Sequence, residues 1–363
     1  MKRLNKLVAI LLAVALLFTV AGCGENTKWA YELDGEQMPA GVYIAYLLDA
    51  FYQASNIVYT EGVAADALFA YTDHPFKEII TKPVEGQDFK VWVKNKAQES
   101  ARKYFAVERE FSKAGLAFDD EYLKAIDASA GNAYNSYKTM YESNGISESS
   151  LRLQTENSAQ KQLLFESIYA KGGTAAVSEA ELKAAFKEKY VKANYMQIPK
   201  PTDFEIPEGK TREEMAAETK KVAEEYAERL RNGETVEDLA YEYELSKAEE
   251  DEKDTVTKPE EGSRTLIVNE NSRATYGDFV VDSLFATAEG KTVVYENDTV
   301  FFVVNRIDIL ADAEDFEDYQ TAVLYLLKSE EFENNITAKA AELDVKANQK
   351  AISRYKVEKL VVE

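Results

Sequence analysis

Apolar residues recur at helical spacing along most of the chain, so the sequence predicts a mainly helical protein. Three long helices are predicted in succession, at about residues 89–114, 119–143 and 148–171. Glycine follows each of them, which is typical of helix ends. A further long helix is predicted at 316–343.

The chain before these helices opens with alternating apolar and polar residues. Trp29–Leu33 predicts a short strand and Asp34-Gly35 a turn. Pro39 marks the start of a helix, because proline is favoured at the first helical position. Beyond this helix the pattern is irregular, and we interpret Asn56–Thr60 as a strand and residues near 63–70 as a short helical piece.

A compact lobe follows the long helices. Ser178 and Glu181 form a capping-box pattern that starts a helix reaching about Tyr190. Within the lobe the pattern predicts two kinds of element. The strands are Ala193–Ile198, Thr292–Tyr295 and Thr299–Ile307, and the helices are Val222–Leu230, Val236–Leu245 and Asp278–Thr287. The last two strands form a hairpin across Asn297-Asp298, and residues 246–264 form a charged loop.

The N-terminus reads as an export signal. Three basic residues precede an apolar run at 7–20, and small residues lead to Cys23. This resembles a bacterial lipobox, so we expect removal of residues 1–22, acylation of Cys23 and anchoring in the membrane. An ordinary cleaved signal with an incidental cysteine is the alternative. Cys23 is the only cysteine, so the chain cannot form an intramolecular disulfide.

Charge and composition narrow the possible partners. Residues 1–22 carry three positive charges and no acids, so their removal takes the formal net charge from −22 to −25. Such an acidic surface argues against nucleic acid as a partner. The chain also has 22 tyrosines, which suit contact with unfolded polypeptides because the ring is apolar and its tip polar. Those placed to form the wall of a binding cradle are Tyr43, Tyr52, Tyr59 and Tyr71.

Most catalytic chemistries lack their residues in this chain. His74 is the only histidine, so a zinc site of histidines and cysteines cannot be assembled. A Ser-His or Cys-His nucleophilic pair would depend on His74, in a stretch punctuated by prolines. Phosphate-binding glycine motifs are absent. We therefore expect no cofactor and no metal.

The order strand–helix–helix–strand in the lobe resembles the parvulin-type peptidyl-prolyl isomerase lobe of the SurA/PrsA family of extracytoplasmic foldases. The closest match is the string Ala227–Ala240, and connectors at 113–116, 144–148 and 177–182 are also similar. The resemblance implies an α+β fold in which a helical chaperone domain is built from residues 23–190 and 312–363. The parvulin-like lobe, at 191–311, is inserted between them.

The resemblance also places candidate site residues. Where the family carries histidine on the first strand, this chain has Tyr195, and the second histidine position falls near Val300 or Phe301. The pocket phenylalanine corresponds to Phe279. The alternative reading of Tyr195, Phe279 and Phe302 is plain core packing.

The resemblance implies a lipid-anchored chaperone or foldase on the extracytoplasmic face of the cell membrane. Its partners would be unfolded or translocating polypeptides, and its isomerase activity weak or absent. Three alternatives remain open: an active isomerase with a rearranged site, a solute-binding lipoprotein and an adaptor lipoprotein with one fixed partner.

Overall fold

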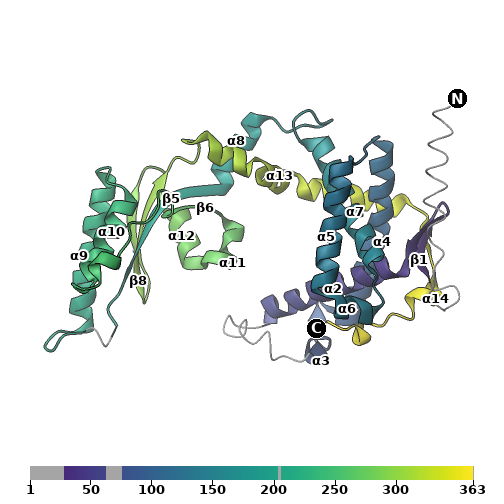
Figure 1. Cartoon of the computed structure of the whole chain (residues 1–363), viewed down its shortest axis with the longest axis horizontal. Coiled ribbons are helices and arrows are strands. Elements are labelled where there is room, and N and C mark those ends of the chain that lie inside the picture. Colours follow the sequence, from purple (N-terminus) through teal and green to yellow (C-terminus); the bar gives the residue numbers. More distant parts are fainter. Residues whose placement is uncertain (1–27, 63–75, 203–205, 363) are drawn as a thin grey trace. The chain divides into compact units, whose positions relative to one another are not determined.

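The computed structural model describes residues 28–62, 76–202 and 206–362. It divides into two compact units. We call the first, built from residues up to Ile168 and from Glu330 onward, the helical unit, and the second, Tyr169–Ser329, the sheet unit. Many of their helices and strands are labelled in Figure 1. The expected α+β class, mainly helical with small antiparallel sheets, is confirmed.

A small sheet joins the two ends of the helical unit. β1 (Trp29–Leu33) pairs antiparallel with β2 (Glu36–Pro39) and with β9 (Lys346–Ala347). Asn348 strengthens the junction, because its side-chain amide donates to the Trp29 carbonyl at 3.0 Å and its backbone N–H to the Ala30 carbonyl at 2.8 Å. The C-terminal segment therefore completes the sheet begun at the N-terminus.

Helices make up most of the helical unit. They are α2 (Ala40–Gly62), α3 (Phe76–Ile79), α4 (Phe89–Lys113), α5 (Asp120–Ser136), α6 (Lys138–Asn144), α7 (Glu148–Tyr169), the end of α13 (Ala313–Glu342) and α14 (Gln349–Ile352), with a 3-10 turn, η5 (Val357–Lys359). The two-stranded pair β3 (Pro83–Val84) and β4 (Gln87–Asp88) leads into α4. Asp88 then caps α4 by accepting from the N–H groups of Lys90 and Val91.

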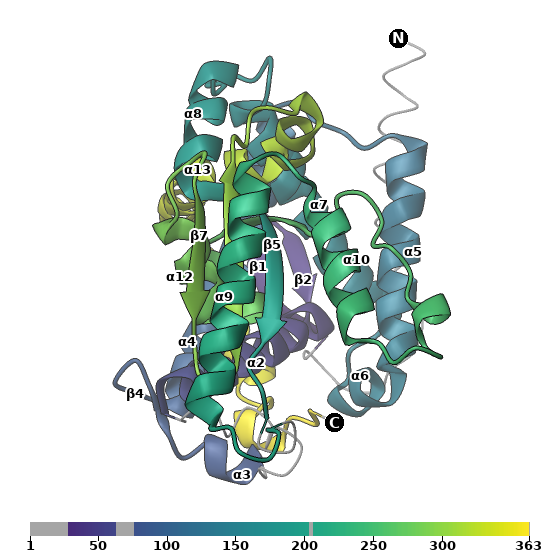
Figure 2. The same ribbon diagram turned by 90° about the vertical axis from the view of Figure 1, so that its left-hand side faces the viewer.

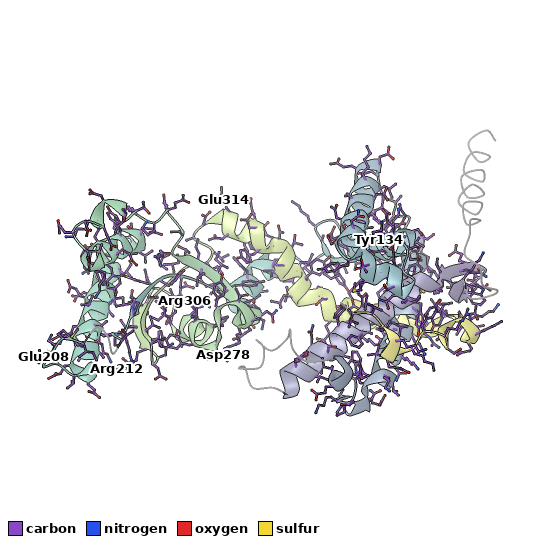
Figure 3. The ribbon with its side chains drawn as sticks, turned by 60° about the horizontal axis from the view of Figure 1, so that its bottom comes forward. Tyr134, Glu208, Arg212, Asp278, Arg306 and Glu314 are labelled. Carbon is purple, nitrogen blue, oxygen red and sulfur yellow. The ribbon has the colours of Figure 1, made fainter. Side chains whose placement is uncertain are left out.

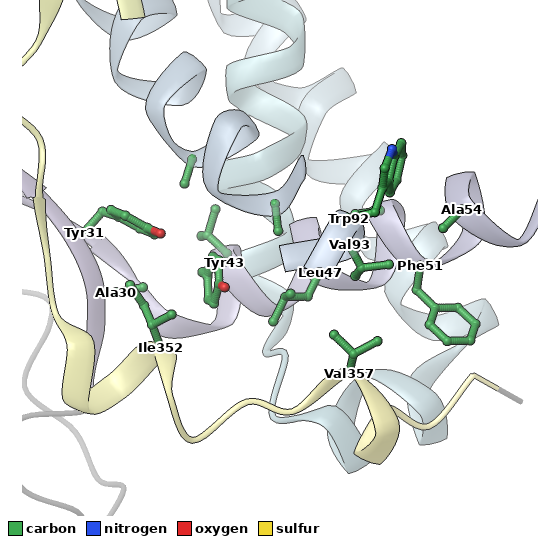
Figure 4. Close-up of a cluster of buried hydrophobic side chains, with 14 of the residues drawn as sticks. Ala30, Tyr31, Tyr43, Leu47, Phe51, Ala54, Trp92, Val93, Ile352 and Val357 are labelled. Atoms are coloured by element: carbon green, nitrogen blue, oxygen red, sulfur yellow. The ribbon is translucent and has the colours of Figure 1, made fainter. Parts of the chain in front are cut away.

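The core of the helical unit lies between α2 and α4 and is closed by the C-terminal segment. Tyr43, Leu47 and Phe51 of α2 are buried against Val93 of α4, and the C-terminal Val357 packs into the same cluster (Figure 4). Phe51 and Phe89 meet edge to face with ring centroids 5.3 Å apart. The burial of residues more than three hundred positions apart in sequence makes the two chain segments one unit.

Two sequence predictions in this unit are wrong. Asn56–Thr60 is not a strand, because α2 continues to Gly62. Its Ile57 and Val58 favour strands intrinsically, but they pack against the core at helical spacing, and this packing decides the conformation. The single helix predicted at 119–143 is two helices, broken at Tyr137, whose backbone angles of φ −125° and ψ 31° are not helical.

The sheet unit contains a four-stranded antiparallel sheet in the order β6-β5-β8-β7. The strands are β5 (Tyr190–Pro199), β6 (Thr265–Asn269), β7 (Thr292–Glu296) and β8 (Val300–Ile307). The predicted hairpin of β7 and β8 is confirmed, as is the capping box of Ser178 and Glu181 that starts α8 (Glu179–Lys189). The pattern did not predict β6.

Helices cover both faces of this sheet (Figure 2). α9 (Arg212–Arg231) and α10 (Val236–Lys247) bury apolar residues against Met196, Ile198 and Phe301 on one face. α12 (Asp278–Ala286), preceded by the short α11 (Arg273–Tyr276), packs against the other face. The connections include the short 3-10 turns η3 (Lys253–Thr255) and η4 (Glu270–Ser272). We call these the α9 face and the α12 face.

The tight approach of α2 and α7 generates a test of the helical unit. A Cβ atom added at Gly41 would lie 2.8 Å from Cβ of Ser150. Helix propensity alone favours alanine over glycine by roughly 0.5–1 kcal/mol. We nevertheless expect Gly41→Ala to lower the free energy of unfolding by about 1–3 kcal/mol, the typical cost of overpacking. Adding Ser150→Gly should recover part of this loss in urea unfolding, whereas strictly additive effects would contradict the contact.

A half-buried carboxyl in the same unit predicts a pH dependence. Glu108 on α4 accepts from Gln160 at 3.2 Å and from Asn157 at 3.5 Å, both on α7. Burial raises the pKa of Glu108, although the two amide hydrogen bonds oppose the shift. The folded state therefore holds this proton more tightly than the unfolded state. Its contribution to stability is full below the unfolded pKa and is lost as the pH rises through the folded pKa.

The Glu108→Gln variant cannot ionise, so its unfolding free energy should lack this part of the pH dependence. We expect the stability of the variant relative to the unchanged protein to increase as the pH rises through the folded pKa of Glu108. Urea unfolding at a series of pH values measures this difference. Glu330→Gln, at an exposed position of α13, is the matched control. A difference that stays constant with pH would show that Glu108 titrates normally.

Candidate functional site

Three aromatic side chains gather on the α12 face of the sheet. Tyr195 of β5 and Phe279 of α12 flank Phe302 of β8, with ring centroids 5.9 and 6.0 Å from the Phe302 ring. Phe302 is fully buried, whereas Tyr195 and Phe279 are half-buried. We call these three residues the aromatic cluster. The sequence-predicted Tyr195 and Phe279 are thus brought to one site, through Phe302.

Strand alternation explains why these rings share a face. Successive side chains of a strand point to opposite faces, so Ala193 and Tyr195 face α12 while Met196 faces α9. Tyr195 lies directly opposite Val304 in the register of β5 and β8. Phe302, two residues before Val304, therefore points to the same side.

The same alternation separates the two positions considered for the second histidine. Phe301 packs on the α9 face, and Lys200 Nζ lies 4.7 Å from its ring centroid. Val300 shares the face of Phe302 and Tyr195, because it lies two residues from Phe302. Of the two positions considered, Val300 is thus the one on the face of Tyr195. Neither offers an imidazole, so the cluster supplies apolar surface and one phenol.

A polar group next to the aromatic cluster was not predicted from the sequence. Thr287, fully buried at the end of α12, shares a hydrogen bond of 3.1 Å with the Tyr295 hydroxyl of β7. Arg306 of β8, labelled in Figure 3, donates to the Thr287 carbonyl at 2.9 Å. A cation at the C-terminal end of a helix is favourable because carbonyl groups are unpaired there. These contacts hold α12, and with it Phe279, against the sheet.

The tyrosines expected to line a cradle do not form one wall. Tyr43 is fully buried and meets Tyr31 with centroids 5.6 Å apart, so its prediction as a binding residue is wrong. Tyr52 donates from its hydroxyl to the Val362 carbonyl at 2.8 Å, and Tyr59 packs half-buried against the core. Tyr71 lies outside the described residues.

A group of tyrosines, one exposed and two half-buried, lies instead where α5 meets α6. Tyr134 and Tyr141 stack with centroids 5.9 Å apart and planes 6° from parallel. Tyr137, at the break between the helices, is 60% exposed and meets Tyr141 edge to face. We call these three residues the tyrosine cluster; Tyr134 is labelled in Figure 3. The sequence showed these tyrosines at helical spacing, and the break at Tyr137 was not predicted.

Some predictions concern residues that the structure does not describe, and others concern metal sites and membrane-spanning helices. Cys23 and His74 lie outside the described residues. Within the described ranges, no three or more histidine, cysteine, aspartate or glutamate side chains are grouped as metal ligands would be. None of the described helices combines the length and apolar character needed to cross a membrane.

Comparison with known proteins gives similarity at the level of structure. No family model matches the sequence, and no curated protein matches it. Among solved structures, foldase protein PrsA from Streptococcus pneumoniae is similar at 14% identity and a TM-score of 0.35, covering 77% of this chain and 96% of that one. PrsA from Bacillus subtilis is similar at 15% identity and a TM-score of 0.28, covering 74% and 93%.

Foldase protein PrsA from Lactococcus lactis is similar at 12% identity and a TM-score of 0.31, covering 89% of this chain and 96% of that one. The solved structures named here are thus PrsA foldases, the class that the sequence resembles. At these low values the similarity does not by itself show membership of their family.

The aromatic cluster predicts how the sheet unit responds to substitution. Phe302→Ala should lower the free energy of unfolding by about 3–5 kcal/mol, because it empties a fully buried position between two rings. Tyr195→Phe keeps the ring and should cost less than about 1.5 kcal/mol. Urea unfolding together with amide hydrogen exchange in β5 and β8 measures both. Equal losses in the two variants would show that the Tyr195 hydroxyl, not ring packing, holds the cluster.

Proposed function

We propose that this protein is a lipid-anchored extracytoplasmic chaperone of the SurA/PrsA-like class, which binds unfolded or translocating polypeptides and has weak or absent prolyl isomerase activity. One observation carries the proposal. Tyr195, Phe279 and Phe302 gather on one face of an antiparallel sheet, and no histidine lies among them. The resemblance to parvulin-type lobes is what suggests an isomerase-like site at these residues.

The chemistry of prolyl isomerisation supports the second half of the proposal. The barrier of about 18–20 kcal/mol comes from amide resonance. An apolar pocket lowers it by removing water, and polar groups lower it further by stabilising the twisted amide. The cluster keeps rings that can contact a proline, but both imidazoles are replaced. These residues therefore fit binding of an apolar segment better than catalysis of prolyl isomerisation.

The helical unit supplies a second surface for clients. The tyrosine cluster exposes rings and hydroxyls together, which favours contact with chains of varied sequence. Anchoring through Cys23 would hold this surface at the membrane where exported chains emerge, since several acyl chains on one residue give a stable anchor.

The alternatives are weighed on the same structure. A solute-binding lipoprotein needs repeated strand–helix–strand alternation in two lobes. In the described parts of the chain every strand pair is antiparallel, which does not favour that class. An active isomerase with a rearranged site would depend on Tyr195. An adaptor with one fixed partner would bind that partner and leave unfolded clients alone.

Aggregation of a reduced, unfolded client in the presence of residues 24–363 tests the proposal. We expect suppression that rises with the amount of the protein and is weakened by Tyr137→Ser. Tyr276→Ser is the matched control, because Tyr276 is also exposed, at 43%, but lies on α11. Failure of the unchanged protein to suppress aggregation would overturn the proposal.

The same preparation should leave a proline-containing peptide close to its uncatalysed exchange time of tens to hundreds of seconds. Fast turnover that Tyr195→Ala abolishes would establish the rearranged isomerase instead.

A further inference from the structure

The strand β7 has an open edge. Asn297 donates to the Val300 carbonyl at 3.1 Å and Arg306 to the Lys291 carbonyl at 3.0 Å, which fixes these two as hydrogen-bonded pairs of the β7–β8 ladder. Because such pairs alternate in an antiparallel ladder, the backbone groups of Thr292, Val294 and Glu296 point away from β8. Among the described residues, no other hydrogen bond is recorded for these backbone groups.

The opposite edge of the sheet is largely closed by its own turns. In β6 the backbone groups of Thr265, Ile267 and Asn269 point outward, since Tyr195 donates to the Arg264 carbonyl. The Thr265 N–H donates to the Gly262 carbonyl at 3.0 Å, and the Asn269 N–H to Ser272 Oγ at 3.1 Å. β7 is therefore the edge with consecutive outward donors.

A groove of about 660 Å³ lies between β7 and α9. Its wall on α9 carries five charged side chains at helical spacing, and its floor is the edge strand. The wall residues are Lys221, Glu224, Glu225, Glu228 and Arg231. The three central glutamates are exposed, and no ion pair is recorded for them among the described residues. The groove thus offers backbone hydrogen bonds on one side and, on the other, three glutamates between the basic Lys221 and Arg231.

We propose that the β7 edge binds an extended, cationic polypeptide segment as an added strand, with basic side chains lying against the glutamates of α9. Figure 2 shows α9 running along the outer strand β7, and the two elements pack together. Alternate residues of a strand are about 6.6–6.8 Å apart. Glu224 and Glu228 are one helical turn apart, about 6 Å along the axis. The spacing of lysines at every second position of the bound strand therefore matches the spacing of Glu224 and Glu228 on α9.

Addition of a strand to an exposed edge is a general mode of peptide recognition, in which backbone bonds give affinity and side chains give selectivity. The inference deepens the proposed function and rests on it for the source of the segment, an unfolded client. It differs from that function in naming the site, the conformation and the charge of what is bound.

The probe is a short, labelled peptide in which lysine alternates with valine, and its binding to residues 24–363 is followed by fluorescence anisotropy. We expect saturable binding that weakens as salt is added, because exposed charge pairs are screened. A peptide with glutamate in place of lysine should bind at least tenfold more weakly. Spermine, a cation without a peptide backbone, should weaken binding no more than replacement of the three glutamates does.

Two variants separate the backbone and charge contributions. Val294→Pro removes an outward N–H without removing a β7–β8 hydrogen bond, and proline is tolerated at such edge positions. It should weaken peptide binding about tenfold, whereas Val294→Ala, which keeps the N–H, should not. Replacing Glu224, Glu225 and Glu228 with glutamine should weaken binding by a similar factor and flatten its salt dependence.

Amide hydrogen exchange gives a readout that does not depend on any variant folding. Added peptide should protect the amides of Thr292, Val294 and Glu296, while those of Val293 and Tyr295 are already protected by β8. Protection at β6 instead, or none, would overturn the proposal. So would complete displacement of the peptide by spermine at matched charge, or a β7–β7 dimer that forms without peptide and blocks binding.

The outcomes also separate this inference from the proposed function. If Val294→Pro loses the peptide but still suppresses client aggregation, clients bind elsewhere and the edge proposal fails as a client site. If the peptide binds at β7 but no client is protected, the edge is real and the chaperone function fails.

Discussion

The sheet unit depends on the burial of β5 and β8 on both faces. Both central strands bury apolar residues on each side. Those on the α9 face are Met196, Ile198, Phe301 and Val303, and those on the α12 face are Val191, Ala193, Phe302 and Val304. Two strands of this kind cannot be left against water on either side, so helices must cover both. The aromatic cluster is a product of this constraint, because Phe302 is at once a core residue and the centre of the candidate site.

The aromatic cluster is held by packing and by neighbouring hydrogen bonds. Tyr195 and Phe279 pack against Phe302, and the bonds among Thr287, Tyr295 and Arg306 fix the helix that carries Phe279. None of these contacts needs a histidine. The folding free energy of the sheet unit is therefore enough to keep these three rings together. The residues of the aromatic cluster that would bind a client under the proposed function are thus the same residues that pack the sheet unit.

The sequence predicted best what local chemistry decides. The Ser178 capping box, the helix after Asp88 and the hairpin at Asn297 are set by residues within a few positions of one another. What it missed depends on distant partners. β9 is two residues long and exists only because Tyr31 and Glu32 pair with it.

The same limit applied to the candidate site. Sequence matching placed Tyr195 and Phe279, but it could not say whether Val300 or Phe301 shares their face, since that follows from strand register. The helix break at Tyr137, in the tyrosine cluster, could not be predicted, because no glycine or proline marks it in the sequence. Tyr43 looked like a surface tyrosine and is buried, because α2 is covered by α4 and by the C-terminal segment.

An open edge strand is a liability, since a second copy of the same chain offers the same unpaired groups. Here the wall beside β7 carries Glu224, Glu225 and Glu228 at its centre and the basic Lys221 and Arg231 at its ends. Two copies approaching edge to edge would bring two such walls together, within a chain whose formal net charge is already −22. Like charges then oppose self-pairing, whereas a cationic segment meets the same wall favourably. The acidic composition, which elsewhere only solvates the surface, thus decides at this edge which chains can add to the sheet.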